Sequence, residues 1–330
     1  MTRVLVTGAT GGLGRVVTEA LMRRGDSVRA TGRNPEVCAC LRQMGAEVVA
    51  GDLNNPEDMP PLVAGVDAVI HCAALSSPWG RYRDFHDINV IATQALLTAA
   101  RAAGVRSFVF ISSPSVYAEM RDRLDLTEQD PIARHPLNAY AATKALAEGE
   151  VLRQDDKEMA CVVLRPRAIV GPHDTVLLPR ILKIMRTGRF PLLRGGQALV
   201  ELTDARDVAD SAIRALDIAH DVSGEIFNIS GARALTIRSM VEALASAIDL
   251  PVRFKSVPLP VATLLARAGE NLFGLLPGRP EPALTQYTLS ILAYAQTFRL
   301  DKARDRLGFV PQYDAMATAI DVARERLNAG

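Results

Sequence analysis

A short apolar run leads into a glycine-rich turn near the start of the chain, in the stretch Val4-Leu5-Val6-Thr7-Gly8-Ala9-Thr10-Gly11-Gly12-Leu13-Gly14. Gly8 permits a tight turn after a strand, Gly11 lets the backbone approach a pyrophosphate, and Gly14 permits close packing of a helix on that strand. The first turn of such a helix offers backbone N–H groups and a partial positive charge to an anion. The stretch therefore predicts a dinucleotide-binding turn between a strand and a helix.

Short apolar runs alternate with helical patterns through the first two thirds of the chain. Strands are expected at residues 4–6, 27–31, 47–50, 67–72, 107–112 and 161–165, and helices at 13–24, 36–44, 85–103 and 139–153. Continuous Val/Ile runs are typical of strands that are buried on both faces, and their alternation with helices indicates a parallel sheet. The fold class is therefore α/β, a Rossmann-type doubly wound sheet with right-handed crossovers.

The pattern loosens after Pro166, where proline and glycine become more frequent. Residues 225–229 look like one more sheet strand, returned late in the chain. We therefore expect a dinucleotide-binding core over residues 1–170, rejoined by residues 200–230. Residues 171–199 and 231–330 are expected to form most of a smaller substrate-binding lobe, so that two lobes interleave. A length of 330 residues agrees with about two domains.

Composition and charge narrow the classes of partner. The 38 basic and 37 acidic residues leave a net charge of +1, which argues against broad capture of nucleic acid or of an anionic membrane. No secretory leader pattern starts the sequence, and the apolar stretch 257–276 is too interrupted for a stable membrane insertion. No cluster has metal-ligand spacing. We expect a cytoplasmic protein with a small-molecule substrate, no metal, and four unpaired thiols: Cys38, Cys40, Cys72 and Cys161.

The end of the second expected strand bears on cofactor choice. An acid at this place would bond the ribose hydroxyls of NAD and repel the phosphate of NADP. The sequence reads Val28-Arg-Ala-Thr-Gly-Arg-Asn34, with no acid. Because the planar fork of Arg33 suits a 2′-phosphate, NADP is favoured and NAD remains possible. Asp52, at the end of the third strand, is placed to meet the adenine amino group.

A second set of polar residues carries the chemistry. Tyr140 and Lys144 are four residues apart and therefore share one face of a helix. A neighbouring ammonium is expected to lower the pKa of the tyrosine toward the working pH. Ser113, just past the fifth strand, is placed to hydrogen-bond a carbonyl oxygen where charge develops during hydride transfer. We therefore expect Ser113, Tyr140 and Lys144 to be catalytic.

Together these motifs resemble the extended short-chain dehydrogenase/reductases over nearly all of the chain. Further matching motifs are His71-Cys-Ala-Ala74, Asn89-Val-x-x-Thr93, Ser112-Ser-x-x-Val-Tyr117 and Leu164-Arg-Pro-x-x-Ile-Val-Gly-Pro172. The resemblance implies that Tyr140 is the general acid/base, that Ser113 positions the substrate oxygen, and that Lys144 binds the nicotinamide ribose. It also implies a homodimer, formed through the helices at 85–103 and 139–153. The full expected cofactor set is Gly8, Thr10, Gly11, Gly12, Leu13, Gly14, Arg33, Asp52, Leu53, Ala73, Ala74, Tyr140, Lys144, Pro166, Ala168 and Ile169.

Departures from the family pattern separate its branches. Sugar-nucleotide dehydratases carry an acid pair where this chain has Pro114 and Ser115, so a dehydratase is rejected. Epimerases carry a diphosphate-binding arginine where this chain has Val200, followed here by Glu201. Arg194 or Arg206 could substitute for that arginine, so an epimerase remains open. The chain fits better the branch that resembles 3β-hydroxysteroid dehydrogenases, through the runs at 112–116, 164–174 and 282–288.

The expected activity is therefore NAD(P)-dependent interconversion of a secondary alcohol and a ketone, on an apolar sterol-like or alkyl substrate. One alternative is a nucleotide-sugar 4-epimerase with tightly bound NAD. Another is a non-catalytic dinucleotide-sensing regulator, which retention of the catalytic residues disfavours. The apolar segment 259–276 either walls the substrate pocket or packs on the core or an oligomer interface. Candidate substrate contacts are Ser76, Trp79, Ser115 and His173.

Overall fold

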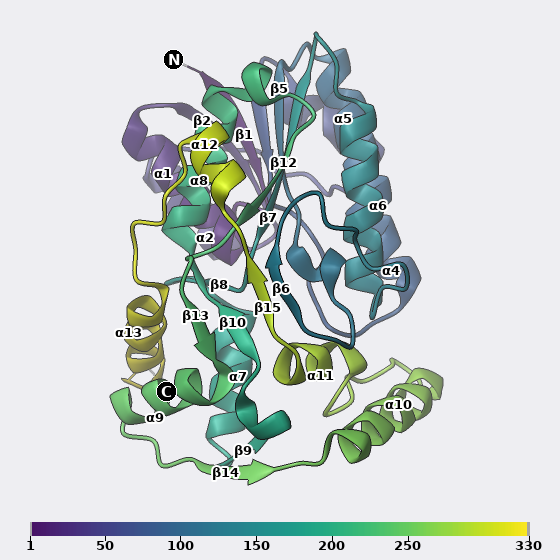
Figure 1. The fold of residues 1–330 in the computed structure, drawn as a ribbon. Coiled ribbons are helices and arrows are strands. Elements are labelled where there is room, and N and C mark those ends of the chain that lie inside the picture. The colour runs from purple at the N-terminus through teal and green to yellow at the C-terminus, as the bar shows by residue number, and fades with distance from the viewer. Residues whose placement is uncertain (1, 329–330) are drawn as a thin grey trace.

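A seven-stranded parallel sheet forms the centre of the molecule in a computed structural model that describes residues 2–328 (Figure 1). Its strands, in spatial order, are β12 (Ile226–Ile229), β7 (Ala160–Pro166), β5 (Ser107–Ile111), β4 (Ala68–His71), β1 (Arg3–Thr7), β2 (Ser27–Thr31) and β3 (Glu47–Val48). The strand order reverses between β1 and β4, which places a ligand crevice at their carboxyl ends. The predicted Rossmann-type fold is confirmed, including the late return of β12.

Alternation along the strands builds one apolar core on each face of the sheet. Val4 and Val6 of β1 face a core shared with α1, α2, α8 and α12, whereas Leu5 faces a core shared with α3, α5 and α6. Figure 1 shows α1, α8 and α12 on one side of the sheet and α5 and α6 on the other. The helices are α1 (Gly12–Arg24), α2 (Pro35–Gln43), α3 (Met59–Val63), α5 (Ala92–Ala102), α6 (Ala139–Arg153), α8 (Ala205–Asp217) and α12 (Asp301–Leu307).

The helix expected over residues 85–103 is interrupted. It consists of α4 (Tyr82–His86) and α5, joined by a π-helical turn over Asp87–Ile91. The expected third strand is also shorter, because it ends at Val48 rather than at residue 50. A π-helical turn inserts one residue into a helix and redirects the side chains that follow, and such turns are frequent at functional sites.

A second core lies below the carboxyl ends of the sheet. It is built by α7 (Leu177–Met185), α9 (Ile237–Ala247), α13 (Ala315–Asn328) and short paired strands around Val170, Phe190 and Val200. The strand pairs are β8 (Ile169–Val170) with β11 (Thr203–Asp204), β9 (Arg189–Leu192) with β14 (Arg253–Ser256), β10 (Leu199–Glu201) with β13 (Ala234–Thr236), and β6 (Arg123–Leu126) with β15 (Gln296–Phe298). The division at residues 1–170, 171–199, 200–230 and 231–330 stays a prediction.

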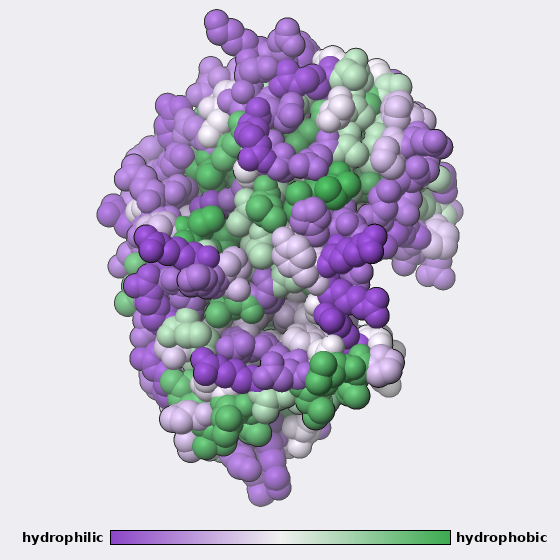
Figure 2. All heavy atoms as spheres, turned by 90° about the vertical axis from the view of Figure 1, so that its right-hand side faces the viewer, coloured by the Kyte–Doolittle hydropathy of each residue, from purple (hydrophilic) through white to green (hydrophobic). Residues whose placement is uncertain are grey.

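The expected apolar segment forms α10 (Leu259–Leu275), which is followed by α11 (Gln286–Ala293). Only Ala262 and Ala266 of α10 are fully buried, while Leu264, Leu265 and Leu275 are exposed. Figure 2 shows apolar side chains gathered at the lower end of this side of the molecule. Within residues 2–328, no helix combines the length and the apolar character that crossing a membrane requires.

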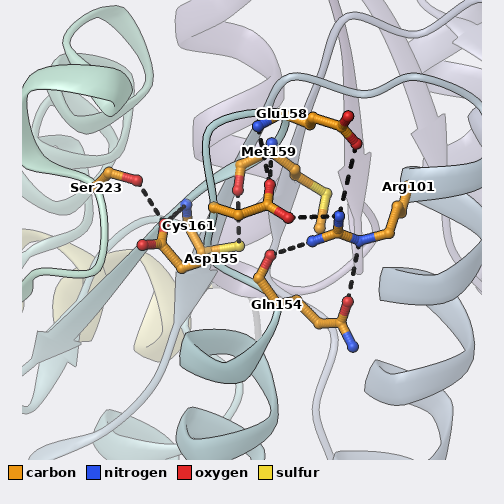
Figure 3. A network of polar contacts seen from close by, with 8 residues as sticks. Arg101, Gln154, Asp155, Glu158, Met159, Cys161 and Ser223 are labelled. Atoms are coloured by element: carbon orange, nitrogen blue, oxygen red, sulfur yellow. Dashed lines mark hydrogen bonds and ion pairs between the residues drawn. The ribbon is translucent and has the colours of Figure 1, made fainter.

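A polar network holds the amino end of β7, opposite to the carboxyl ends of the strands where the ligand crevice lies (Figure 3). Arg101 of α5 contacts the carboxylate of Asp156 at 2.7 Å. Asp155 accepts hydrogen bonds from the backbone N–H of Cys161 at 2.7 Å and from the hydroxyl of Ser223 at 2.5 Å. The loop that follows α6 is thereby tied to α5, to β7 and to the segment that enters β12.

Candidate active site

The glycine turn between β1 and α1 has no room for side chains. Gly8 has a φ of 64°, and a Cβ on it would lie 2.8 Å from the backbone nitrogen of Ala73. A Cβ on Gly14 would overlap the carbonyl oxygen of Gly8. The N–H of Gly11 donates to that same carbonyl at 2.9 Å, and Gly11 itself is exposed. The first turn of α1 is therefore reachable from outside, and its cramped backbone fits a dinucleotide phosphate.

The end of β2 lies beside this turn. The side chain of Thr10 fills the space next to Gly32, where a Cβ would meet its Oγ1. Arg33 follows and is exposed. Asp52 lies beyond β3, also exposed, and its carboxylate accepts from the backbone N–H of Asn54 at 3.0 Å. The expected adenosine-binding residues therefore lie on the side of the crevice where β2 and β3 end.

Tyr140 stands in the first turn of α6, which begins there because Asn138 accepts a hydrogen bond from the N–H of Ala141 at 2.9 Å. Burial raises the pKa of Tyr140, and the hydroxyls of Ser113 and Ser76 partly offset this rise. The Oγ of Ser113 accepts from the N–H of Ser115 at 3.2 Å, so its own proton is free to point toward the tyrosine. The tyrosine is thus kept neutral at neutral pH and is equipped to donate a proton.

Lys144 lies one turn further along α6 and is buried. Its ammonium donates to the carbonyl of Ile111 at 2.6 Å and lies 4.2 Å from the ring centre of Phe110. Burial lowers the pKa of Lys144 to about 7, and Glu148 opposes that shift. The expectation that this ammonium lowers the pKa of Tyr140 is wrong for this structure, because Lys144 is turned to the end of β5 and burial dominates at the tyrosine.

Glu148 is a site residue that the sequence analysis missed. It lies one turn beyond Lys144 and is buried. Its carboxylate accepts from Nε and Nη2 of Arg165 at 2.9 and 2.5 Å, and from the hydroxyl of Ser112. This pair joins α6 to the ends of β5 and β7 and so fixes the helix that carries Tyr140. An acid four residues after Lys144, on the same helix face, was the available signal.

The π-helical turn places Asn89 against the loop that follows β4. Its Oδ1 accepts from the N–H of Leu75 at 2.8 Å, and its Nδ2 donates to Thr143 on α6 at 3.1 Å. Ala73 and Ala74 precede Leu75 and are thereby held beside the glycine turn. His71 is buried between the hydroxyls of Thr7 and Thr93, and burial lowers its pKa to about 3. His71 is therefore a neutral core residue that orders this edge.

The chain leaves β7 at Pro166 through a constrained backbone. Ala168 has a φ of 39°, and its carbonyl accepts from the N–H of Thr203 at 3.1 Å. This kink turns Ile169 out of the large sheet and into the β8–β11 pair. Pro166, Ala168 and Ile169 therefore lie at the carboxyl end of β7, on the same edge of the sheet as Ser113.

A pocket opens between η3 (Pro114–Tyr117), the end of β7 and α11. It is lined by Ser115, Arg167 and Tyr287, among others. Burial raises the pKa of Tyr287 to about 12; Tyr140 adds to that rise and Arg167 opposes it. Arg167 and Tyr287 were not predicted as site residues. Their contact joins positions 120 residues apart, which no local pattern reports.

The four candidate substrate residues divide into two groups. Ser76 lies at the hydroxyl of Tyr140, and Ser115 lines the pocket. The indole N–H of Trp79 donates to the carbonyl of Arg279 at 3.0 Å, so it joins the β4 loop to the segment after α10. His173 lies against α1, with its ring nitrogen 3.6 Å from Glu19. A substrate contact by His173 stays a prediction that its position does not favour.

The two arginines that could hold a sugar-nucleotide diphosphate are both engaged. Arg194 binds both carboxylate oxygens of Asp122, at 2.8 and 2.9 Å. Arg206 binds Asp204 at 2.7 Å and lies over the ring of Tyr313. Val200, at the position where epimerases carry an arginine, is buried. The site therefore lacks a free diphosphate-binding arginine at these positions.

Comparisons with known proteins agree with this geometry. The NAD dependent epimerase/dehydratase family matches residues 4–230. The chain is 35% identical to a 2-alkyl-3-oxoalkanoate reductase of Stenotrophomonas maltophilia, over 94% of this chain and 95% of the relative. It is 33% identical to a 4-hydroxy-2-methyl-3-oxo-4-farnesyl-3,4-dihydroquinoline-1-oxide ketoreductase of Stigmatella aurantiaca, over 93% and 91%.

A solved structure supports the same assignment. It is a short-chain dehydrogenase/reductase superfamily protein of Agrobacterium tumefaciens with bound NAD, 26% identical, with a TM-score of 0.75 over 99% of this chain and 98% of the other. The family match covers more than half of the chain, and both named relatives are reductases. The chain therefore belongs to the NAD-dependent epimerase/dehydratase family and is an oxidoreductase of the short-chain dehydrogenase/reductase type.

Proposed function

We propose that this enzyme interconverts a secondary alcohol and a ketone on an apolar skeleton, with Tyr140 as the proton donor and acceptor. The observation that carries this assignment is that the hydroxyls of Ser113 and Ser76 both act on the phenol of Tyr140. Asn89 links α6, which carries Tyr140, to the loop after β4, and that loop lies against the glycine turn. A nicotinamide cofactor bound at that turn supplies the hydride. The residues of the chain position the substrate oxygen and move its proton.

Each residue has a distinct role in this proposal. Because its pKa is raised, Tyr140 carries its proton at neutral pH and donates it to the ketone oxygen as charge develops there. Ser113 donates a second hydrogen bond to that oxygen. Lys144 binds the ribose hydroxyls of the nicotinamide half, and it exchanges its bond with Ile111 for them. Glu148 acts as a positioning residue through its pairs with Arg165 and Ser112.

For the cofactor, we propose that NADP is preferred over the NAD that the family name states. Arg33 is exposed at the end of β2, and no acid lies between residues 28 and 34 to repel a 2′-phosphate. Thr10, Gly12, Leu13 and Leu53 complete the cofactor-binding set. Kinetics with NADPH and NADH test this preference, and equal kcat/KM for the two would contradict it.

Two features support an apolar substrate. The two named relatives act on a farnesyl dihydroquinoline oxide and on a 2-alkyl-3-oxoalkanoate, and farnesyl and alkyl groups are apolar. In this chain α10 carries exposed leucines, and Trp79 joins the segment after α10 to the β4 loop. A homodimer through α5 and α6 and a cytoplasmic location stay predictions.

The test is cofactor turnover by the purified protein over a panel of apolar ketones. Wild type is expected to oxidise NADPH, and Tyr140→Phe to lose about 100-fold or more in kcat because the proton donor is gone. Tyr82→Phe, at an exposed tyrosine on α4, is the matched control. Full activity of Tyr140→Phe would overturn the catalytic assignment.

The epimerase alternative fits less well, because Arg194 and Arg206 are both engaged by acids. A set of UDP-sugars in the same assay distinguishes the two readings. Sugar interconversion without net cofactor change, together with no reduction of any ketone, would show that the enzyme is an epimerase.

A further inference from the structure

Arg167 carries a buried guanidinium that has no hydrogen-bond partner among residues 2–328. Its exposed fraction is 6%, and it follows directly on β7. Among residues 2–328, no carboxylate lies within ion-pair distance of it, and its fully buried Nε has no hydrogen-bond partner. Only its backbone is bound, through the N–H to Ile229 at 2.8 Å and the carbonyl to Thr203. A buried charge in this state destabilises the fold unless something else compensates for it.

Arg165, two residues earlier, shows what a structural arginine looks like here. Its guanidinium binds both oxygens of Glu148, donates to the hydroxyl of Tyr117, and lies over that ring. Arg165 and Arg167 are similarly buried, at 3% and 6% exposed. The contrast indicates that Arg167 is not placed to hold the fold together.

The charged and titratable groups around Arg167 do not neutralise it. Glu201 is the acid that interacts with it, but its oxygens accept from the hydroxyl of Ser230 and the N–H of Phe298. Burial also raises the pKa of Glu201, which weakens its negative charge. Glu119, on the same pocket wall, is bound by Arg121 and Arg123.

The pocket in front of Arg167 offers further donors. The Oγ of Ser115 is buried and has no hydrogen-bond partner among the described residues. The phenol of Tyr287 lines the same pocket, and its pKa responds to the charges of both Tyr140 and Arg167. Ser115 is also only two residues from Ser113 on one 3₁₀ turn. An anion held at Ser115 would therefore share this turn with the serine that positions the reacting oxygen.

We propose that Arg167, with Ser115 and Tyr287, binds a carboxylate that the substrate carries close to its reacting carbon, as in a 3-oxo or 3-hydroxy acid. The planar fork of one arginine suits a carboxylate, whereas a diphosphate would need further free cations. The carboxylate takes no part in the bonds made or broken. In reduction the carbonyl carbon receives the hydride of the reduced cofactor and the carbonyl oxygen receives the proton of Tyr140. In oxidation Tyr140 first releases its own proton to solvent, the hydroxyl proton then passes to the tyrosine, and the alcohol carbon gives its hydride to the oxidised cofactor. This inference rests on the proposed function.

The experiment compares a long-chain 3-hydroxy acid with its methyl ester, both oxidised with NADP as the cofactor. For wild type, kcat/KM is expected to favour the acid. Arg167→Met is expected to lose about tenfold to hundredfold in kcat/KM for the acid, chiefly through KM, with the ester unchanged. Arg167→Lys, which keeps the charge without the fork, should fall between them. Arg121→Met is the matched control, because Arg121 lines the same pocket but is exposed and paired with Glu119.

Thermal unfolding of the same variants provides a readout without substrate. Because Arg167→Met removes an uncompensated charge, its Tm is expected to equal or exceed that of wild type. A lowered Tm together with equal losses on acid and ester would make Arg167 structural and overturn the inference. Equal wild-type kcat/KM for acid and ester would also overturn it, while turnover of neutral ketones leaves the proposed function standing. An enzyme that oxidises neither probe and reduces no ketone refutes both.

Discussion

Replacement of Lys144 by methionine should remove a pH dependence of stability that the buried ammonium creates. Burial lowers the pKa of Lys144 from 10.5 to about 7 in the folded protein. Between pH 7 and pH 9 the folded protein therefore loses this proton while the unfolded chain keeps it. Stability rises with pH wherever the unfolded state binds more protons, so the Lys144 contribution improves as pH increases.

The size of the effect follows from the two pKa values. At pH 7 the buried lysine lowers the unfolding free energy by about 4 kcal/mol relative to an exposed one, and at pH 9 by about 2 kcal/mol. Between pH 7 and pH 9 the unfolding free energy of wild type should therefore rise by about 2 kcal/mol relative to that of Lys144→Met. At pH 7 the lost bond to Ile111 and contact with Phe110 offset part of the relief, by about 1 to 3 kcal/mol.

Urea unfolding of nucleotide-free protein at pH 7, 8 and 9 measures this difference. Comparing the variant with wild type cancels other groups that titrate in the window. Cys72, which interacts with Lys144, has its pKa raised to about 12 by burial and stays protonated throughout. Parallel stability curves for the two proteins over pH 7–9 would refute the argument, because they would mean that Lys144 keeps its charge when folded.

Three further outcomes follow from the same geometry. Gly14→Ala should abolish nucleotide binding in a titration, because its Cβ would overlap the carbonyl of Gly8. Arg33→Ala should raise KM for NADPH by about tenfold to hundredfold and leave KM for NADH unchanged; equal changes would contradict a 2′-phosphate contact. Glu148→Gln should lower the unfolding free energy by about 3 kcal/mol or more, since Arg165 is left without its buried partner. A change below about 1 kcal/mol in urea unfolding would contradict that role.

The features predicted from the sequence are those that local pattern encodes. The glycine turn, the alternating strands and helices, and the pairing of Tyr140 with Lys144 on one helix all depend on short spacings. The direction of the Lys144 side chain does not, because it is set by the carbonyl of Ile111 and the ring of Phe110 on another element. For the same reason burial, rather than the neighbouring charge, decides the pKa of Tyr140.

Two kinds of site feature lay beyond that reasoning. The π-helical turn that presents Asn89 is a one-residue insertion inside an otherwise regular helical pattern, so the pattern predicts one continuous helix. Arg167 and Tyr287 meet only because α11 folds back over the end of β7. The lack of an ion-pair partner for Arg167 among residues 2–328 depends on how distant segments pack, so no local sequence pattern reports it.

The hydrogen bond from Trp79 to the carbonyl of Arg279 has a practical consequence. The chain contains one tryptophan, and that residue joins a loop of the sheet to the segment after α10. Its indole emission is therefore a built-in optical reporter of the contact between these two segments. Breaking of this hydrogen bond would expose the indole to more water and shift its emission to longer wavelength, so any separation of the two segments on ligand binding could be followed by stopped-flow fluorescence without a label.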